Sequence, residues 1–266
     1  MTGDVYAVYA IRYGHHDRPA SENFIAGDPH DDENMPLDYF VWAVVGEGRT
    51  FVLDTGFDPK VGVARGRTQL TPIAEGLASV GVDVATVEDV VISHMHYDHA
   101  GNIGLFPNAR FHIQDEEMAY CTGRCMCHRI MRYPFEASNV ADMVHKTFEG
   151  KVQFHDGDTT LAPGITLHKL GGHTKGLQIM RVNTRRGPIV LASDATHLYA
   201  NLEREHPFPV LADVGPYLEG LKTLRRLAGA SLDHIIPGHD PVVLNRFPRV
   251  HADMVDVVRL DADPIG

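Results

Sequence analysis

The chain has 266 residues and a formal net charge of −11, from 24 Lys and Arg against 35 Asp and Glu. Nucleic acid is an improbable partner, because phosphate backbones attract basic patches and Arg185–Arg186 and Arg225–Arg226 are isolated pairs. No apolar run reaches 18 residues, and the first residues lack a secretory signal. Three cysteines do not form a disulfide framework. We therefore expect a cytoplasmic protein without a membrane span, folded as a single domain over residues 1–266.

Segments rich in β-branched and aromatic residues predict strands in both halves of the chain. They cover residues 5–11, 37–45, 50–53, 87–92 and 109–113, then 152–154, 159–161, 165–168, 177–182, 188–194 and 232–240. A second half is expected to begin near Val152, and His234 is expected to be a packed core histidine within the last strand.

Apolar residues at helical spacing predict helices over 70–80 and 214–228. Asp115 is expected to cap another helix, at the start of a helical insertion that covers the site. The polar segment 15–35 predicts a long loop, which either roofs a pocket or is a mobile surface excursion.

The most informative stretch is His94-Met95-His96-Tyr97-Asp98-His99, which follows an apolar strand. Side chains alternate in an extended segment, so His94 and His96 point the same way, while Asp98 and His99 follow where the chain turns. Imidazoles with a carboxylate are typical ligands of zinc and similar divalent ions. Four ligands so close together are too crowded for one tetrahedral ion, which suggests two adjacent metals.

This H-x-H-x-D-H pattern resembles the signature of the metallo-β-lactamase superfamily, and within it the N-acyl homoserine lactonase-like group. The resemblance implies an α/β fold, the αβ/βα four-layer sandwich, and a complete set of ligands. One ion would take His94, His96 and His173, the other would take Asp98, His99 and His239, and Asp194 would bridge both. Asp54 would orient a ligand histidine, although a plain turn residue is the alternative.

The implied cofactors are two divalent ions, which we expect to be Zn²⁺, sharing a hydroxide at neutral pH. The implied function is a metal-dependent hydrolase that opens a small-molecule lactone, either a quorum-quenching N-acyl homoserine lactone substrate or a catabolic lactone. A glyoxalase II-like thioesterase or another ester or amide hydrolase is the alternative. A di-iron redox protein of the same fold is more remote, because such proteins tend to carry glutamate where His96 stands. The sequence leaves the natural substrate and the oligomeric state open, a homodimer included.

One departure concerns the tyrosine that such lactonases carry three residues beyond the bridging aspartate. Here that position is His197, and Tyr199 follows two residues later. His197 and Tyr199 are therefore the candidates to assist at the oxyanion, and Asp98 is the candidate to pass a proton to the leaving oxygen.

A group of thiols forms a further candidate metal site. Cys121, Cys125 and Cys127, with His128, offer zinc-type ligands, but the spacing lacks the C-x2-C pairs of common zinc modules. Small packed thiols are the simpler interpretation.

Overall fold

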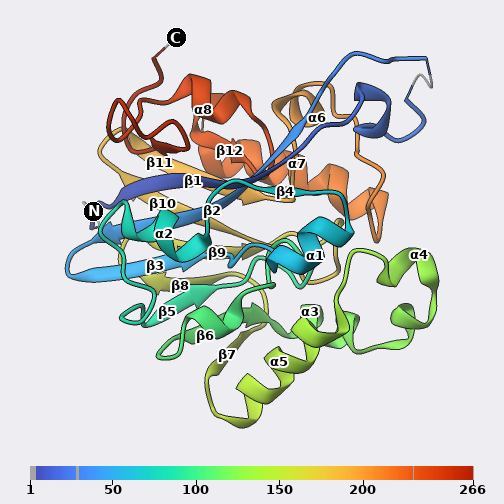
Figure 1. Cartoon of the computed structure of the whole chain (residues 1–266), viewed down its shortest axis with the longest axis horizontal. Coiled ribbons are helices and arrows are strands. Elements are labelled where there is room, and N and C mark those ends of the chain that lie inside the picture. Colours follow the sequence, from blue (N-terminus) through green and yellow to red (C-terminus); the bar gives the residue numbers. More distant parts are fainter. Residues whose placement is uncertain (1–3, 28–29, 230, 266) are drawn as a thin grey trace.

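The computed structural model describes residues 4–27, 30–229 and 231–265, and their strands form two sheets (Figure 1). The first sheet has the order β13-β1-β2-β3-β5-β6-β7, with the short β4 paired to β1. Its strands are β1 (Ala7–His16), β2 (Leu37–Gly46), β3 (Arg49–Leu53), β4 (Thr68–Gln69), β5 (Asp89–Val91), β6 (Arg110–Gln114), β7 (Val152–His155) and β13 (Val257–Arg259). From β3 to β7 the neighbours are parallel, and from β13 to β3 they are antiparallel.

The second sheet has the order β12-β11-β10-β9-β8 and is antiparallel except for the parallel pair β11 and β12. Its strands are β8 (Thr159–Ala162), β9 (Ile165–Lys169), β10 (Gln178–Thr184), β11 (Gly187–Ser193) and β12 (Ile235–Pro237). The helices are α1 (Pro59–Ala64), α2 (Ile73–Ala78), α3 (Asp115–Cys121), α4 (Arg129–Arg132), α5 (Ala137–Phe148), α6 (Tyr199–Glu203), α7 (Val214–Ala228) and α8 (Val242–Arg246). None of the helices in the described residues is long and apolar enough to cross a bilayer.

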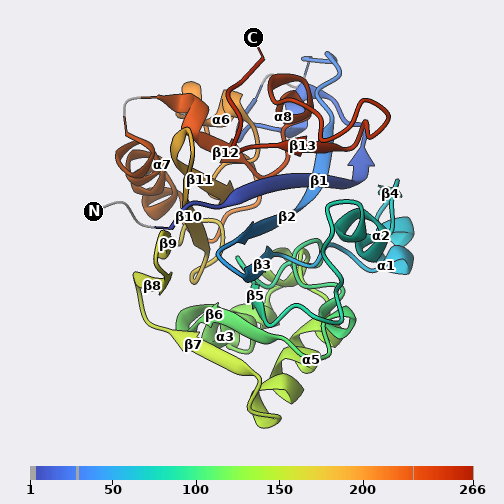
Figure 2. The same ribbon diagram turned by 90° about the vertical axis from the view of Figure 1, so that its left-hand side faces the viewer.

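Period-two alternation in the strands gives each sheet two apolar faces. In β2, Phe40 and Trp42 join the cluster between the sheets, whereas Tyr39 and Val41 face the helices. Helices α2, α3 and α5 cover the outer face of the first sheet, and α7 covers that of the second, where Leu221 belongs to the core. Figure 2 shows α2 and α7 on opposite sides of the paired sheets. The architecture is therefore the expected αβ/βα four-layer sandwich.

A buried amide ties the two sheets together beside the ligand-bearing loop. The Gln178 side chain donates to the carbonyl oxygens of Ile92 and His112, at 2.9 and 3.0 Å, and accepts from Gln114 at 2.9 Å. Both glutamines are completely buried, and these hydrogen bonds offset the cost of their desolvation. The contact sets the strand end that carries the ligands against the second sheet.

Four local predictions are wrong in extent or placement. Helix α2 covers only Ile73–Ala78, because Thr68–Gln69 pairs with β1 and Pro72 delays the helix. Asp115 is the first residue of α3 rather than its cap. Strand β7 pairs with β6, so the second sheet starts at β8 and not near Val152.

The fourth correction concerns the predicted strand 232–240. Only Ile235–Pro237 is a strand, and Leu232–His234 before it is a 3₁₀ turn. His234 is half-buried at the end of that turn instead of being packed in the core. The remaining strand predictions and the helix over 214–228 are confirmed, with shifts of a few residues at the ends.

Candidate metal centre

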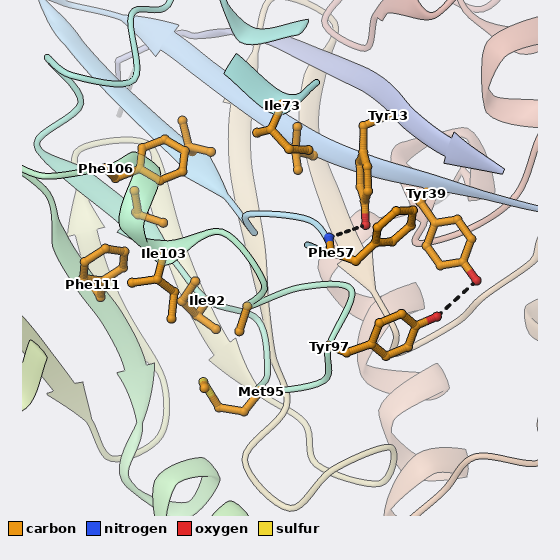
Figure 3. Packing of buried hydrophobic residues seen from close by; sticks show 14 of the residues in the cluster. Tyr13, Tyr39, Phe57, Ile73, Ile92, Met95, Tyr97, Ile103, Phe106 and Phe111 are labelled. Carbon is orange, nitrogen blue, oxygen red and sulfur yellow. Dashed lines mark hydrogen bonds between the residues drawn. The ribbon is translucent and has the colours of Figure 1, made fainter. Parts of the chain in front are cut away.

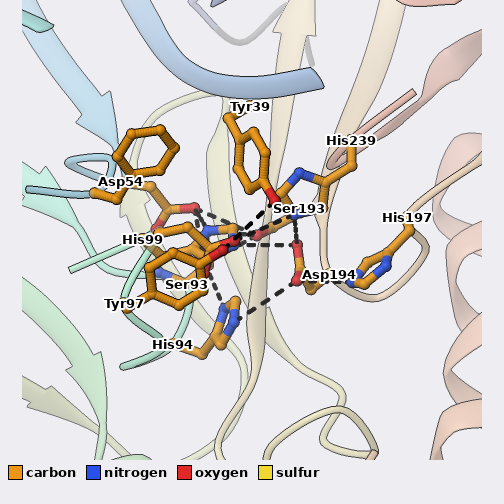
Figure 4. Close-up of polar contacts among 12 residues, drawn as sticks. Tyr39, Asp54, Ser93, His94, Tyr97, His99, Ser193, Asp194, His197 and His239 are labelled. Atoms are coloured by element: carbon orange, nitrogen blue, oxygen red, sulfur yellow. Dashed lines mark hydrogen bonds and ion pairs between the residues drawn. The ribbon is translucent and has the colours of Figure 1, made fainter. Parts of the chain in front are cut away.

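The predicted ligands converge at one end of the sandwich, on the loops that follow strands of both sheets. His94, His96, Asp98 and His99 follow β5, and His173 lies in the connection from β9 to β10. Asp194 follows β11 and His239 follows β12, and Figure 4 shows both facing the histidines of the first sheet. All seven side chains are buried.

The side chains form the two groups that the resemblance implies. Ligand atoms of His94, His96 and His173 lie within 4.8 Å of one another, and so do those of Asp98, His99 and His239. Asp194 stands between the groups. Its Oδ2 is 3.2 Å from Nε2 of His173, and its Oδ1 is 3.2 Å from Nε2 of His99 and 3.0 Å from that of His239. Each carboxylate oxygen therefore faces one group.

Hydrogen bonds at Nδ1 point the Nε2 atoms of the histidines inward. His173 donates to the carbonyl oxygen of Val210 at 2.7 Å, and His239 donates to that of Asp38 at 2.9 Å. His99 donates to Asp54 Oδ2 at 2.7 Å. Such partners fix the tautomer and ring orientation of metal-bound imidazoles.

Asp54 is the hub of the polar layer beneath the site, as the resemblance implies. Its two oxygens accept from the backbone N–H and the hydroxyl of Ser93, at 2.7 and 2.8 Å, as well as from His99. Asp54 and Ser193 adopt φ angles of +64° and +43°, which are unusual for residues with a Cβ. Such strain typically persists where the surrounding contacts demand one geometry, and here both residues border the ligands.

Burial and neighbouring charges shift the pKa values of the clustered residues in different directions. Burial, reinforced by the neighbouring imidazoles, lowers the pKa of His94 and of His96 well below the usual value, which favours the neutral, metal-binding form. Burial also acts to lower the pKa of His99, but the carboxylates of Asp194 and Asp54 outweigh it and raise that pKa. Burial would raise the pKa of Asp194, yet the surrounding imidazoles hold it well below its usual range.

Two buried polar atoms of the site lack hydrogen-bond partners, which also fits a bound metal. Nε2 of His99 and Oδ1 of Asp194 are buried and make no hydrogen bond with any described residue. Buried polar atoms are normally satisfied, so two such atoms in a cluster of imidazoles and carboxylates suit a bound cation. The donor set, five imidazoles and two carboxylates, fits two zinc-type ions.

Sequence reasoning overlooked Glu117, a completely buried carboxylate of α3. It accepts from the backbone N–H groups of Met95 at 2.8 Å and Gly176 at 3.1 Å. Glu117 thus joins the ligand loop after β5 to the loop that carries His173. A Cβ at Gly176 would lie 2.2 Å from the Glu117 backbone nitrogen, so only glycine permits this approach. Burial raises the pKa of Glu117, and its hydrogen-bond donors oppose that rise.

We predict that Glu117→Gln destabilises the protein by about 1–3 kcal/mol, because an amide nitrogen replaces one acceptor facing buried N–H groups. The free energy of unfolding of the metal-free protein and the metal content after purification are the measurements. The adjacent Glu116→Gln is the control, since that side chain is 48% exposed and pairs with Lys169 on the surface. Equal effects of both substitutions would contradict the role assigned to Glu117.

The structure brings only one of the two candidate helpers to the site. Nε2 of His197 is 2.9 Å from Asp194 Oδ2, and its ring stacks on Phe208 with centroids 3.4 Å apart. Burial lowers the pKa of His197 to about 3. Tyr199 instead belongs to the core between the sheets, beneath the guanidinium of Arg246, and its hydroxyl has no hydrogen-bond partner among the described residues.

The three cysteines occupy different environments. Cys121 is buried at the end of α3, Cys125 is half-buried in the following 3₁₀ turn (Arg124–Cys127), and Cys127 is exposed. Burial raises the pKa of the Cys121 thiol. Among the residues that the structure describes, no cysteine belongs to a group able to hold a metal ion. The expectation of packed thiols is thus confirmed for Cys121 and for Cys125, which packs against the core, and is wrong for Cys127.

Tyrosines of β1, β2 and the loop after β5 adjoin the ligands, and sequence reasoning missed them. The hydroxyls of Tyr39 and Tyr97 lie 3.5 Å apart, and the Tyr39 ring packs edge-on against His239 (Figures 3 and 4). Tyr13 donates to the carbonyl oxygen of Asp98 at 2.8 Å and accepts from Phe57 N–H, which anchors the ligand loop in the core. From the sequence, these aromatic residues are expected only in the core. Their contacts with the ligands depend on tertiary packing and could not be predicted.

Two spaces open onto the ligands. A narrow one of about 70 Å³ contains Asp98, Asp194 and His197 together with the two tyrosines. A second, of about 260 Å³, shares His96 and His173 with it and is otherwise mainly apolar. A further cavity of about 650 Å³ lies beneath the helical insertion. Its lining includes Met126 and Phe135, while Met131 lines the 260 Å³ space and Met143 is buried in the core.

The family model of the Metallo-beta-lactamase superfamily matches residues 35–239, which span the complete ligand set. The chain belongs to this superfamily. The resemblance inferred from the H-x-H-x-D-H pattern is thereby confirmed, including its lactonase-like relatives.

Among its relatives, an N-acyl homoserine lactonase of Bacillus sp is 27% identical over 177 residues, covering 65% of this chain and 64% of that protein. The N-acyl homoserine lactonase AttM of Azorhizobium caulinodans is 29% identical over 177 residues, covering 61% of this chain and 62% of that protein. The chain thus matches less than two thirds of the length of these relatives.

Solved structures share the fold at lower identity. A quorum-quenching N-acyl homoserine lactone lactonase superposes with a TM-score of 0.74 at 23% identity, covering 90% of this chain and 93% of that one. AidC, described as a dizinc quorum-quenching lactonase, gives a TM-score of 0.69 at 17% identity, covering 90% of this chain and 91% of its own. Similarity at this level establishes the shared fold.

Proposed function

We propose that the protein is a di-metal hydrolase that opens the ring of a lactone. The observation that carries the proposal is the placement of Asp194, whose two oxygens each face one group of three ligand side chains. The names of the relatives, which are N-acyl homoserine lactonases, favour a lactone over other esters. Because fewer than two thirds of their residues are matched, we propose the lactone substrate for this chain together with the reaction.

The proposed ligands are those predicted from the sequence. His94, His96 and His173 would hold one ion, Asp98, His99 and His239 would hold the other, and Asp194 would bind both. When bound, two zinc ions supply Lewis acidity toward the substrate carbonyl and a water of lowered pKa.

The chain's own residues would position the substrate and move its protons. The mainly apolar 260 Å³ space beside His96 and His173 accepts an apolar substituent of the substrate and excludes water from that side. Asp98 lines the narrow space, where its carboxylate would take a proton from the attacking water and pass it to the departing ring oxygen.

We further propose that His197 takes the place of the tyrosine expected in lactonases. Its Nε2 lies at the wall of the narrow space, 2.9 Å from Asp194 Oδ2, and its N–H would be shared between that carboxylate and an oxygen of the substrate. Tyr199 is not suited to this role, because its hydroxyl is enclosed in the core.

We expect His197→Ala to lower kcat about 10²–10³-fold, the usual cost of losing one oxyanion donor. Tyr199→Phe should leave kcat nearly unchanged, since that hydroxyl makes no hydrogen bond in the described structure. Steady-state kinetics would be measured together with metal content, so that a loss of ions is not mistaken for a loss of the donor. A larger effect of Tyr199→Phe would reverse the assignment.

The proposed reaction is tested by a substrate panel with the zinc-loaded protein. N-acyl homoserine lactones, simple γ-lactones, an S-acyl glutathione thioester, a β-lactam and a phosphodiester would be compared by kcat/KM, and oxygen uptake would be recorded in parallel. Preference for a lactone supports the proposal. Turnover of the thioester alone would replace the lactonase by a thioesterase, and oxygen uptake with an iron-loaded protein would favour the redox alternative.

A further inference from the structure

The narrow space in front of the ligands has an unexpected concentration of positive charge. Arg18, Arg65 and Arg67 all line it, although the chain as a whole has 24 basic against 35 acidic residues. Among the described residues, the carboxylates that line this space are Asp98 and Asp194. Both belong to the proposed ligand set, so neither is available to neutralise an arginine.

Arg67 is the arginine whose charge lacks a partner. Its Nε donates to the hydroxyls of Tyr39 at 3.2 Å and Tyr97 at 3.0 Å, and one Nη donates to the carbonyl oxygen of Arg65. All these acceptors are neutral. Within the described part of the chain, Arg67 forms no ion pair, and its second Nη makes no hydrogen bond. The guanidinium is thus oriented by the two phenols while retaining unused donors.

The other two arginines differ in how far they are neutralised. Arg65 pairs with Glu136 at 2.7 Å and lies over the Tyr97 ring at 4.3 Å, so a carboxylate already balances its charge. Among the described residues, Arg18 pairs with one carboxylate, that of Glu22, at 3.4 Å, and this side chain is 56% exposed. One Nη of Arg18 also donates to the carbonyl oxygen of Glu22. Nε of Arg18 is buried without a hydrogen bond to any described residue. Arg18 therefore adds positive charge that is poorly compensated within the protein.

We infer that the substrate carries a carboxylate which binds Arg67, assisted by Arg18, beside the group that is hydrolysed. This inference rests on the proposed function, because it assigns a substrate class to the same site. A partly buried guanidinium with free donors is costly until an anion pairs with it, and its planar fork matches a carboxylate. The adjoining, mainly apolar 260 Å³ space, which shares His96 and His173 with the narrow one, accepts the remainder of such a substrate.

A binding experiment tests the inference independently of turnover. Glutarate and glutaramate have the same length and share one carboxylate, but the second end is a carboxylate in the first and an amide in the second. Isothermal titration calorimetry of the zinc-loaded protein at pH 7.5 should show glutarate binding roughly 10-fold more tightly, the effect of one charge-assisted pair. Higher salt should shrink the difference.

Substitutions locate the site of discrimination. Arg67→Gln should reduce the glutarate preference to about 1, Arg67→Lys should retain part of it, and Arg18→Gln should reduce it to a smaller extent. Arg65→Gln is the matched control, because this arginine lines the same space but is paired with Glu136, and the preference should persist. Thermal unfolding identifies any misfolded variant, and Arg18→Gln still tests the inference if Arg67→Gln does not fold.

Kinetics then separates this inference from the proposed function. The zinc-loaded protein would be assayed with 5-oxotetrahydrofuran-2-carboxylate and its carboxamide, for which we expect a roughly 10-fold preference in kcat/KM for the carboxylate. If neither lactone opens but glutarate is still preferred through Arg67, the lactonase proposal fails and the carboxylate site stands. If both lactones open equally and glutarate binds no better than glutaramate, the carboxylate site is overturned and the lactonase stands.

Discussion

Treating the zinc-loaded protein with a chelator should abolish lactone hydrolysis, the largest effect expected for any change to this protein. The side chains that line the narrow space include no serine or cysteine nucleophile among the described residues, so the attacking water depends on the bound ions. Elemental analysis should find close to two ions per chain before treatment and none afterwards, and added zinc should restore activity. Full activity in protein shown to be metal-free would refute the proposed metal centre.

Replacing Asp194 by Ala should cost more than replacing any single ligand histidine. Both groups of ligands face Asp194, so its removal takes one ligand from each ion and leaves the imidazoles without a central negative charge. We expect a loss of several kcal/mol of transition-state stabilisation, on the order of 10³-fold in kcat/KM, together with reduced metal content. His96→Ala should have a smaller effect on both, because only the first group loses a member.

The comparison needs a control for handling and metal loading. His145→Ala serves this purpose, because His145 is an exposed residue of α5. Equal losses in Asp194→Ala and His96→Ala, at equal metal content, would contradict a role for Asp194 in binding both ions.

Strand positions were the most predictable part of the fold, because their runs of aromatic and β-branched residues are visible in the sequence. In β2, Tyr39, Phe40, Val41 and Trp42 form one continuous run of this kind, and only the structure shows that they pack alternately into two clusters. Partner choice is not local. Strand β7 joins the first sheet through its pairing with β6, and no pattern within Val152–His155 indicates this. The helix predicted from the apolar spacing that starts at Leu70 likewise begins later, because Thr68–Gln69 pairs with β1.

The same distinction applies to the site. Four of the proposed ligands could be predicted from one six-residue motif, whereas the resemblance to the superfamily implied the other three. Glu117 and Arg67 could not be predicted, because each looks like an ordinary charged surface residue until distant loops pack against it. Tyr199 shows the opposite error. It is close to Asp194 in sequence and was therefore a candidate for the site, but its side chain packs in the core and away from the cavity.

The division of the ligands between the sheets has a consequence for biosynthesis. As the chain emerges from the ribosome, the loop after β5 appears long before β11 and β12, which carry Asp194 and His239 to the site. The early histidines can therefore meet a metal ion before the residues that complete its surroundings exist. Capture of the proposed pair of ions would therefore be a late event, tied to the docking of the second sheet, and the bound ions would stabilise the contact between the two halves of the sandwich.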